Sequence, residues 1–123
     1  MPATRSPRQP IALKSPSATP VGVLRTRLGL TQAECVRLLG VSVRTLAALE
    51  AGGPASASVV RSLVELARLV ESLSEVIQPT ALGTWFQSPN PAFDGLKPLE
   101  VVERGETDRL FEMVYFLRSG VPS

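Results

Sequence analysis

Glycines and hydroxyl-bearing residues divide the first half of the sequence into short helices, and one junction between two helices is only three residues long. A helix that begins at Thr31 ends at Gly40, and Ser42 begins the next helix. Glycine relieves the strain of a left-handed helix end, and a serine hydroxyl accepts a hydrogen bond from an amide in the first helical turn. This spacing predicts a helix-turn-helix, whose second helix can enter the major groove of DNA.

The preceding segment carries its own start and stop signals. Thr19 followed by Pro20 predicts a helix start, and Gly29 predicts its left-handed end. Residues 31–34 read as a capping box, in which the side chains of the first and last residues bond each other's backbone amides. We therefore expect a helix-turn-helix region over residues 19–55.

A longer and more apolar helix is expected to follow, from Ser56 or Ser58 to a point before Pro79, within a connecting region of residues 56–78. Its inward stripe is predicted at three- and four-residue spacing, namely Val60, Leu63, Leu66, Ala67, Val70, Leu73 and Ile77. Four further residues widen this face: Val59, Val64, Leu69 and Val76. So broad a face needs cover from two sides. We expect the N-terminal helices on one side, and the C-terminal segment, a partner chain or both on the other.

The C-terminal segment, residues 79–123, is predicted to hold two more helices. Pro98 begins the first and Gly105 ends it, and the second runs to Gly120. The second helix has one apolar face, formed by Leu110, Phe111, Val114 and Leu117. The only tryptophan, Trp85, stands in the loop-rich stretch before these helices. We expect it to fill the space between the long helix and the last helix.

Composition excludes several classes of function. The 123 residues include one cysteine and no histidine, so an intrachain disulfide, a zinc site and a Cys-His or Ser-His nucleophile are not available within one chain. We expect no enzyme, no cofactor and no metal, and we interpret Cys35 as a core residue rather than a redox site. The charges within residues 59–77 exclude a membrane span, and no N-terminal signal peptide is visible, so we expect a cytoplasmic protein.

Charge is distributed unevenly along the chain. Residues 1–58 hold seven Lys or Arg and two acidic residues, whereas residues 59–123 hold six and nine. This asymmetry indicates two surfaces with different partners, or chance among few charges. Residues 1–18, with four prolines among polar and basic residues, predict a disordered arm, and contact of this basic arm with phosphate is the alternative.

Residues 28–52 resemble the helix-turn-helix of the Xre/Cro repressors, through Gly-Leu-Thr-Gln, Gly-Val-Ser and the closing Glu-Ala-Gly. The resemblance implies operator DNA as a partner and two reading helices in a dimer on paired half-sites. The candidate DNA contacts are Gln32 toward the phosphate backbone and Ser42, Val43, Arg44, Thr45 and Ala48 on the reading helix. Arg44 is the main candidate for a guanine contact, with a phosphate contact as the alternative. A helix-turn-helix used only for packing also remains open.

The last third of the chain resembles the toxin-binding domain of the Xre/MbcA/ParS antitoxins. The resemblance rests on a signature of turn residues and one aromatic residue: Trp85, Pro89, Asn90, Pro98, Leu99 and Gly105. Our interpretation of this signature is structural, with Asn90 bonding the loop backbone. The arrangement of a helix-turn-helix followed by this domain is also that of the family.

The resemblance implies an antitoxin that occludes a RES-like, NAD-degrading toxin and represses its own operon. The candidate toxin contacts lie on the last helix and the tail: Phe111, Tyr115, Arg118, Ser119, Gly120, Val121, Pro122 and Ser123. We expect a homodimer or a larger hetero-oligomer with the toxin, and no membrane partner. The alternative is a stand-alone transcriptional regulator whose C-terminal half serves dimerisation or another protein contact.

Overall fold

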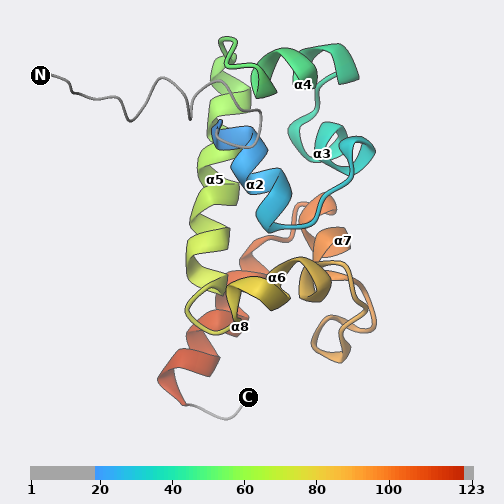
Figure 1. The fold of residues 1–123 in the computed structure, drawn as a ribbon. Helices are drawn as coiled ribbons and strands as arrows, with labels where there is room; N and C mark the ends of the chain where they lie inside the picture. The colour runs from blue at the N-terminus through green and yellow to red at the C-terminus, as the bar shows by residue number, and fades with distance from the viewer. Residues whose placement is uncertain (1–18, 121–123) are drawn as a thin grey trace, which may run out of the picture.

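The computed structural model describes residues 19–120, and all regular structure within this range is helical, which confirms the predicted all-α class (Figure 1). The elements in chain order are α2 (Pro20–Arg27), α3 (Gln32–Leu39), α4 (Val43–Glu50), α5 (Ala57–Leu73), α6 (Pro79–Phe86), the 3-10 turn η3 (Pro91–Phe93), α7 (Pro98–Glu103) and α8 (Asp108–Ser119). The predicted arm, residues 1–18, and the tail residues Val121, Pro122 and Ser123 lie outside the described range. Helix α5 is the longest element and forms the axis of the molecule.

Helices α2, α3 and α4 lie around the first part of α5, and α6, α7 and α8 lie around its end (Figure 1). Helix α5 packs against α2 and α3 on one side and against α8 on the other. The expectation of two covers for this helix is therefore confirmed for its buried positions. Within the described residues, no helix is long and apolar enough to cross a membrane.

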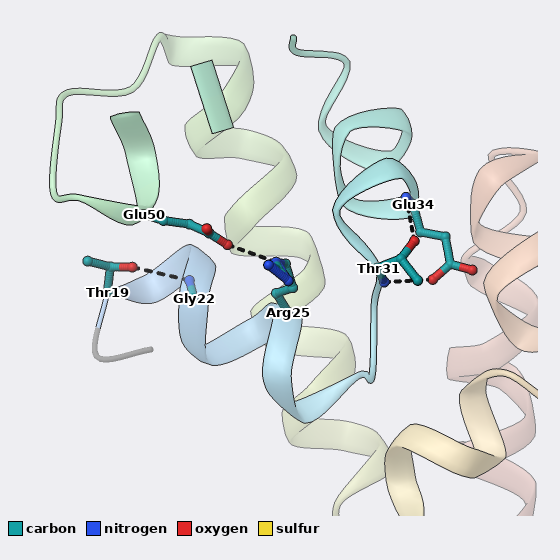
Figure 2. A network of polar contacts seen from close by, with 6 residues as sticks. All are labelled: Thr19, Gly22, Arg25, Thr31, Glu34 and Glu50. Carbon is teal, nitrogen blue, oxygen red and sulfur yellow. Dashed lines mark hydrogen bonds and ion pairs between the residues drawn. The ribbon is translucent and has the colours of Figure 1, made fainter. Parts of the chain in front are cut away.

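The start and end of α2 follow the predicted signals. The Thr19 hydroxyl accepts a hydrogen bond from the Gly22 amide at 3.2 Å (Figure 2). Gly29 has a positive φ of 65°, and the Leu30 amide donates to the Arg25 carbonyl at 2.9 Å. This six-residue backbone bond closes the helix end and folds Leu30 back into the core.

The predicted helix-turn-helix junction is also present. The Glu34 amide donates to the Thr31 hydroxyl at 3.1 Å, and the Thr31 amide donates to the Glu34 carboxylate at 2.9 Å (Figure 2). Gly40 ends α3 with a φ of 68°, and the Ser42 hydroxyl accepts the Thr45 amide at 3.1 Å to begin α4. Local hydrogen bonds thus fix both helix starts and the turn between them.

Helix α5 differs from the prediction in its length and in its inward face. It begins after Ser56 but ends at Leu73, well before Pro79. The Ser74 hydroxyl donates to the Val70 carbonyl at 2.7 Å, a bond that competes with continued helix. Five apolar residues are buried: Val59, Leu66, Leu69, Val70 and Leu73. Three residues placed on the predicted apolar face are instead exposed: Val60, Val64 and Ala67. Because apolar residues surround most of the helix, periodicity alone did not identify the packed side.

Helix α6 was not predicted and occupies part of the stretch expected to be loop. Pro79 stands at its first turn, where a missing amide costs nothing. Its last residue, Phe86, is fully buried, whereas Trp85 is half-buried. The Trp85 ring lies edge-on to Phe93 with centroids 6.4 Å apart. The core position that we expected for Trp85 therefore belongs to Phe86.

The remaining turn predictions are confirmed. The Asn90 side chain accepts the Ala92 amide at 2.9 Å, and its backbone bonds Leu96 and Gly95 at 3.0 Å each. Pro98 begins α7 and is buried with Leu99. The glycine after α7, Gly105, has a φ of 79°, and the glycine after α8, Gly120, has a φ of 71°.

Candidate functional site

The first candidate surface is the exposed face of α4, at the upper end of the molecule in Figure 1. Leu46 and Leu49 are buried and fix the helix on the core. The predicted contacts Ser42, Val43, Arg44, Thr45 and Ala48 are all exposed. Val43 leaves 51% of its surface accessible, an unusual exposure for valine. The first turn of α4 is thus open to a partner.

Arg44 differs from other arginines of this region in its contacts. Arg25 pairs with Glu50 at 2.8 Å (Figure 2), and Arg37 pairs with Glu103 at 2.9 Å. Within residues 19–120, the Arg44 side chain has no ion pair. Its guanidinium remains available to a phosphate or a base edge.

Gln32 is exposed at the first position of α3, where backbone amides and the helix dipole favour an anion. The adjacent carboxylate of Glu34 is held in internal hydrogen bonds. Burial raises the pKa of Glu34, but hydrogen bonds from Thr31 and Gln87 and the charge of Arg37 outweigh that effect, so the pKa is lowered. Glu34 is therefore ionised near neutral pH and occupied by the fold.

Cys35 lies on the inner side of α3 and is buried, in agreement with the prediction. Burial raises the pKa of its thiol, with opposite smaller effects from Arg25 and Glu50. A thiol with a raised pKa is a weak nucleophile at neutral pH. No group of three or more Cys, Asp or Glu side chains suited to a metal ion occurs among the described residues.

The second candidate surface is the last part of α8, at the opposite end of the molecule (Figure 1). Tyr115 and Leu117 leave 63% and 59% of their surface accessible. The Tyr115 ring lies 5.5 Å from the Phe116 ring at a steep angle. Together with the half-buried Phe111 and Phe116, they form an aromatic and aliphatic surface, here called the α8 patch.

The prediction that Leu117 lies on the inward face with Leu110 and Val114 is wrong. Leu110 and Val114 are buried, whereas Leu117 is exposed. The reason is the length of α8, whose last turns extend beyond the packed end of α5 (Figure 1). No described helix covers this part of α8.

The predicted toxin contacts Arg118, Ser119 and Gly120 are exposed beside the α8 patch. Arg118 pairs with Glu75 at 3.0 Å, and the Ser119 hydroxyl donates to the Phe116 carbonyl at 3.3 Å. Arg118 therefore has a solvent-exposed acidic neighbour within the chain, and a partner must compete for it. The structure brings these residues together with Tyr115.

Two contacts between the halves were missed by sequence reasoning. The Gln87 side-chain amide donates to the Gly29 carbonyl at 3.0 Å and to the Glu34 carboxylate at 2.8 Å. Gly29 and Gly83 approach so closely that a Cβ on Gly29 would lie 3.2 Å from the Gly83 Cα. The only sequence signal was a glycine inside a helix-forming stretch, which indicates close backbone approach.

Known proteins with similar sequences identify the family. No family model matches the sequence. The mycobacterial cidal antitoxins MbcA of Mycobacterium tuberculosis (strain ATCC 25618 / H37Rv) and of Mycobacterium bovis are 31% identical to this chain over 96 residues. The aligned region covers 77% of this chain and 85% of each relative. The chain belongs to the MbcA antitoxin family.

The fold agrees with this assignment to the MbcA family. A chain in the crystal structure of the M. tuberculosis MbcT–MbcA toxin–antitoxin complex superposes with a TM-score of 0.66 and 31% sequence identity. The likeness covers 88% of this chain and 96% of that chain. The resemblance to the Xre/MbcA/ParS antitoxins predicted from the sequence is therefore confirmed.

Proposed function

We propose that this protein is the antitoxin of a toxin–antitoxin system and acts by binding its cognate toxin directly. Membership in the MbcA family supports this role. The observation that carries it furthest is the likeness, over nearly the whole of both chains, to a chain from a crystallised toxin–antitoxin complex. The protein is proposed to work without catalysis and without a cofactor, in the cytoplasm.

The α8 patch and its rim are the proposed toxin-binding surface, within residues 79–123. Tyr115 and Leu117 supply exposed apolar area, and aromatic residues are enriched among those that dominate interface energetics. Arg118, Ser119 and Gly120 form the polar rim. The tail residues Val121, Pro122 and Ser123 belong to the same proposal and lie outside the described range.

The proposed toxin is a RES-like enzyme that degrades NAD, and the proposed mode of inhibition is occlusion of its active site. The resemblance in the sequence supports the toxin class. The position of the α8 patch supports occlusion, because its helix extends beyond the packed end of α5 and can enter a concave partner surface (Figure 1).

A direct test uses the product of the gene adjacent to this one as the toxin. Leu117→Asp places a charge in the apolar centre of the proposed interface and should weaken toxin binding by about 100-fold, measured by calorimetry. Ala81→Asp, at an exposed position of α6, is the matched control and should bind normally. Unchanged affinity of Leu117→Asp would reject this surface.

We propose as the second activity that α4 and the start of α3, within residues 19–55, bind operator DNA and repress the antitoxin's own operon. In this proposal Arg44 contacts a base or a phosphate, Gln32 contacts the backbone, and Ser42, Val43, Thr45 and Ala48 face the groove. Their exposure supports the proposal, as does the absence of an ion pair to Arg44 within residues 19–120. Residues 56–78 connect this region to the toxin-binding region.

DNA from the region upstream of the gene provides the probe. Arg44→Ala should weaken binding by about 1–3 kcal/mol if Arg44 reads a base, and raised salt should weaken binding of both proteins. Arg104→Ala is the matched control, because Arg104 is exposed after α7, in the C-terminal half. A binding curve for Arg44→Ala that overlays the unsubstituted curve would remove α4 from the proposed DNA surface.

A further inference from the structure

One side of α5 carries an exposed row of residues that no described element covers. The row follows three- and four-residue spacing and consists of Ala57, Val60, Val64, Ala67 and Glu71, here called the α5 ridge. Val60 and Val64 each leave 45% of their surface accessible. Spacing of this kind places side chains on one stripe of a helix, as in the seam between two paired helices.

A groove runs beside the α5 ridge, between α2 and α5. Its volume is about 720 Å³, and its lining is largely apolar, with Val23 and Leu24 on one wall and Leu63 on the other. Val60 and Val64 of the ridge also line this groove. A ridge and a groove therefore share one patch, which is the shape that a twofold-symmetric interface requires, because each copy presents the same surface to the other.

The charges at the two ends of the ridge favour a second copy as the occupant. Within residues 19–120, the side chains of Arg61 and Glu71 make no hydrogen bond or ion pair. Arg61 precedes the midpoint between Val64 and Ala67 by one residue less than Glu71 follows it, a mismatch of about 1.5 Å along a helix. An antiparallel pair of α5 helices centred at that midpoint would therefore bring Arg61 of each copy beside Glu71 of the other.

We propose that a second copy of this chain covers the α5 ridge in an antiparallel α5–α5 pairing. Val60 and Val64 of each copy enter the groove of the other, and two symmetric Arg61–Glu71 ion pairs close the ends. Ala57 and Ala67 allow the helices to approach closely. The α8 patch takes no part in this pairing, so self-association is independent of toxin binding and of DNA binding.

The first experiment measures the mass of the protein alone, without toxin or DNA, by sedimentation at tens of micromolar. The protein should be a dimer, and Val64→Arg should raise the dimer dissociation constant by at least about 100-fold, because it places a charge in the apolar centre. Leu117→Arg is the matched control, an exposed apolar residue on α8, and should remain a dimer. A monomeric unsubstituted protein, or a Val64→Arg dimer of normal strength, would overturn the proposal.

The second experiment reverses the charges at exposed positions that do not disturb the fold. Arg61→Glu and Glu71→Arg should each raise the dissociation constant by about tenfold, since each places like charges together. The double variant Arg61→Glu/Glu71→Arg should recover the dimer, because both symmetric pairs are restored with opposite orientation. Recovery distinguishes a second copy from any unlike partner, and failure of the double variant to recover would reject the antiparallel register.

Discussion

The helix-turn-helix half and the C-terminal half are built by different means. Each helix of the first half starts with a hydroxyl that accepts an amide of its first turn, at Thr19, Thr31 and Ser42. Helices α6 and α8 have no side-chain cap of this kind, and α6 relies on a proline in its first turn. Local hydrogen bonds specify the first half, whereas packing on α2, α5 and α7 holds the second.

The exposed surfaces of the two halves differ as well. The α4 face presents small and polar side chains with the unpaired charge of Arg44. The α8 patch presents Tyr115 and Leu117, which are aromatic and aliphatic. The first chemistry suits a charged polymer and the second suits a protein surface. The difference teaches that one small chain can serve two unlike partners when their surfaces lie at opposite ends of a shared axis.

The largest expected effect tests whether these halves are separate at all. Phe86 is fully buried in the common core, so Phe86→Ala should lower the free energy of unfolding by about 3–5 kcal/mol. Because the core is continuous, both halves should unfold together, with one denaturant midpoint for Trp85 fluorescence and for helical circular dichroism. Loss of the Trp85 signal at a lower denaturant concentration than the helical signal would show two independent units.

A smaller effect measures the contact between the halves, using two glycines with nearly the same backbone. Gly29 and Gly40 have φ values of 65° and 68°, so alanine at either position costs about 1–2 kcal/mol of left-handed strain. A Cβ on Gly29 would also lie 3.2 Å from the Gly83 Cα, whereas a Cβ on Gly40 meets nothing within 4 Å. Gly29→Ala should therefore cost more than Gly40→Ala, by about 1 kcal/mol or more, in urea unfolding. Equal costs would mean that the two halves do not press on each other at this point.

The smallest effect concerns pH. The pKa of Glu34 is lowered from 4.5 in the folded protein, so its ionised form stabilises the fold above that pH. This stability is lost as the pH falls through the lowered pKa. The advantage of the unsubstituted protein over Glu34→Gln should therefore shrink below pH 4.5, measured as urea midpoints. The shrinkage should be smaller in a Gln87→Ala background, which lacks one of the bonds that lower the pKa. A difference that does not vary with pH would show that Glu34 is not coupled to the fold.

The same contrast explains how far the sequence predicted the structure. The bounds of α2, α3 and α4 followed from capping residues and glycines, because those signals act within a few residues. The turn around Asn90 and the starts at Pro98 and after Gly105 were predictable for the same reason.

What could not be predicted depends on long-range packing. The packed side of α5 was partly wrong because its apolar residues surround most of the helix, and only the positions of α2, α3 and α8 select Leu69 over Val64. Leu117 fits an inward periodicity, but no described element reaches it. The bonds of Gln87 join residues more than fifty positions apart, and no local pattern announces them.

The central claim is that toxin contact and DNA contact lie at opposite ends of one folded chain. The most direct test is growth rescue in cells that express the adjacent gene product, with antitoxin variants supplied from a constant promoter. Arg44→Ala should rescue growth as well as the unsubstituted protein, and Leu117→Asp, produced at equal level, should fail to rescue. Full rescue by Leu117→Asp, or loss of rescue by Arg44→Ala, would contradict this account.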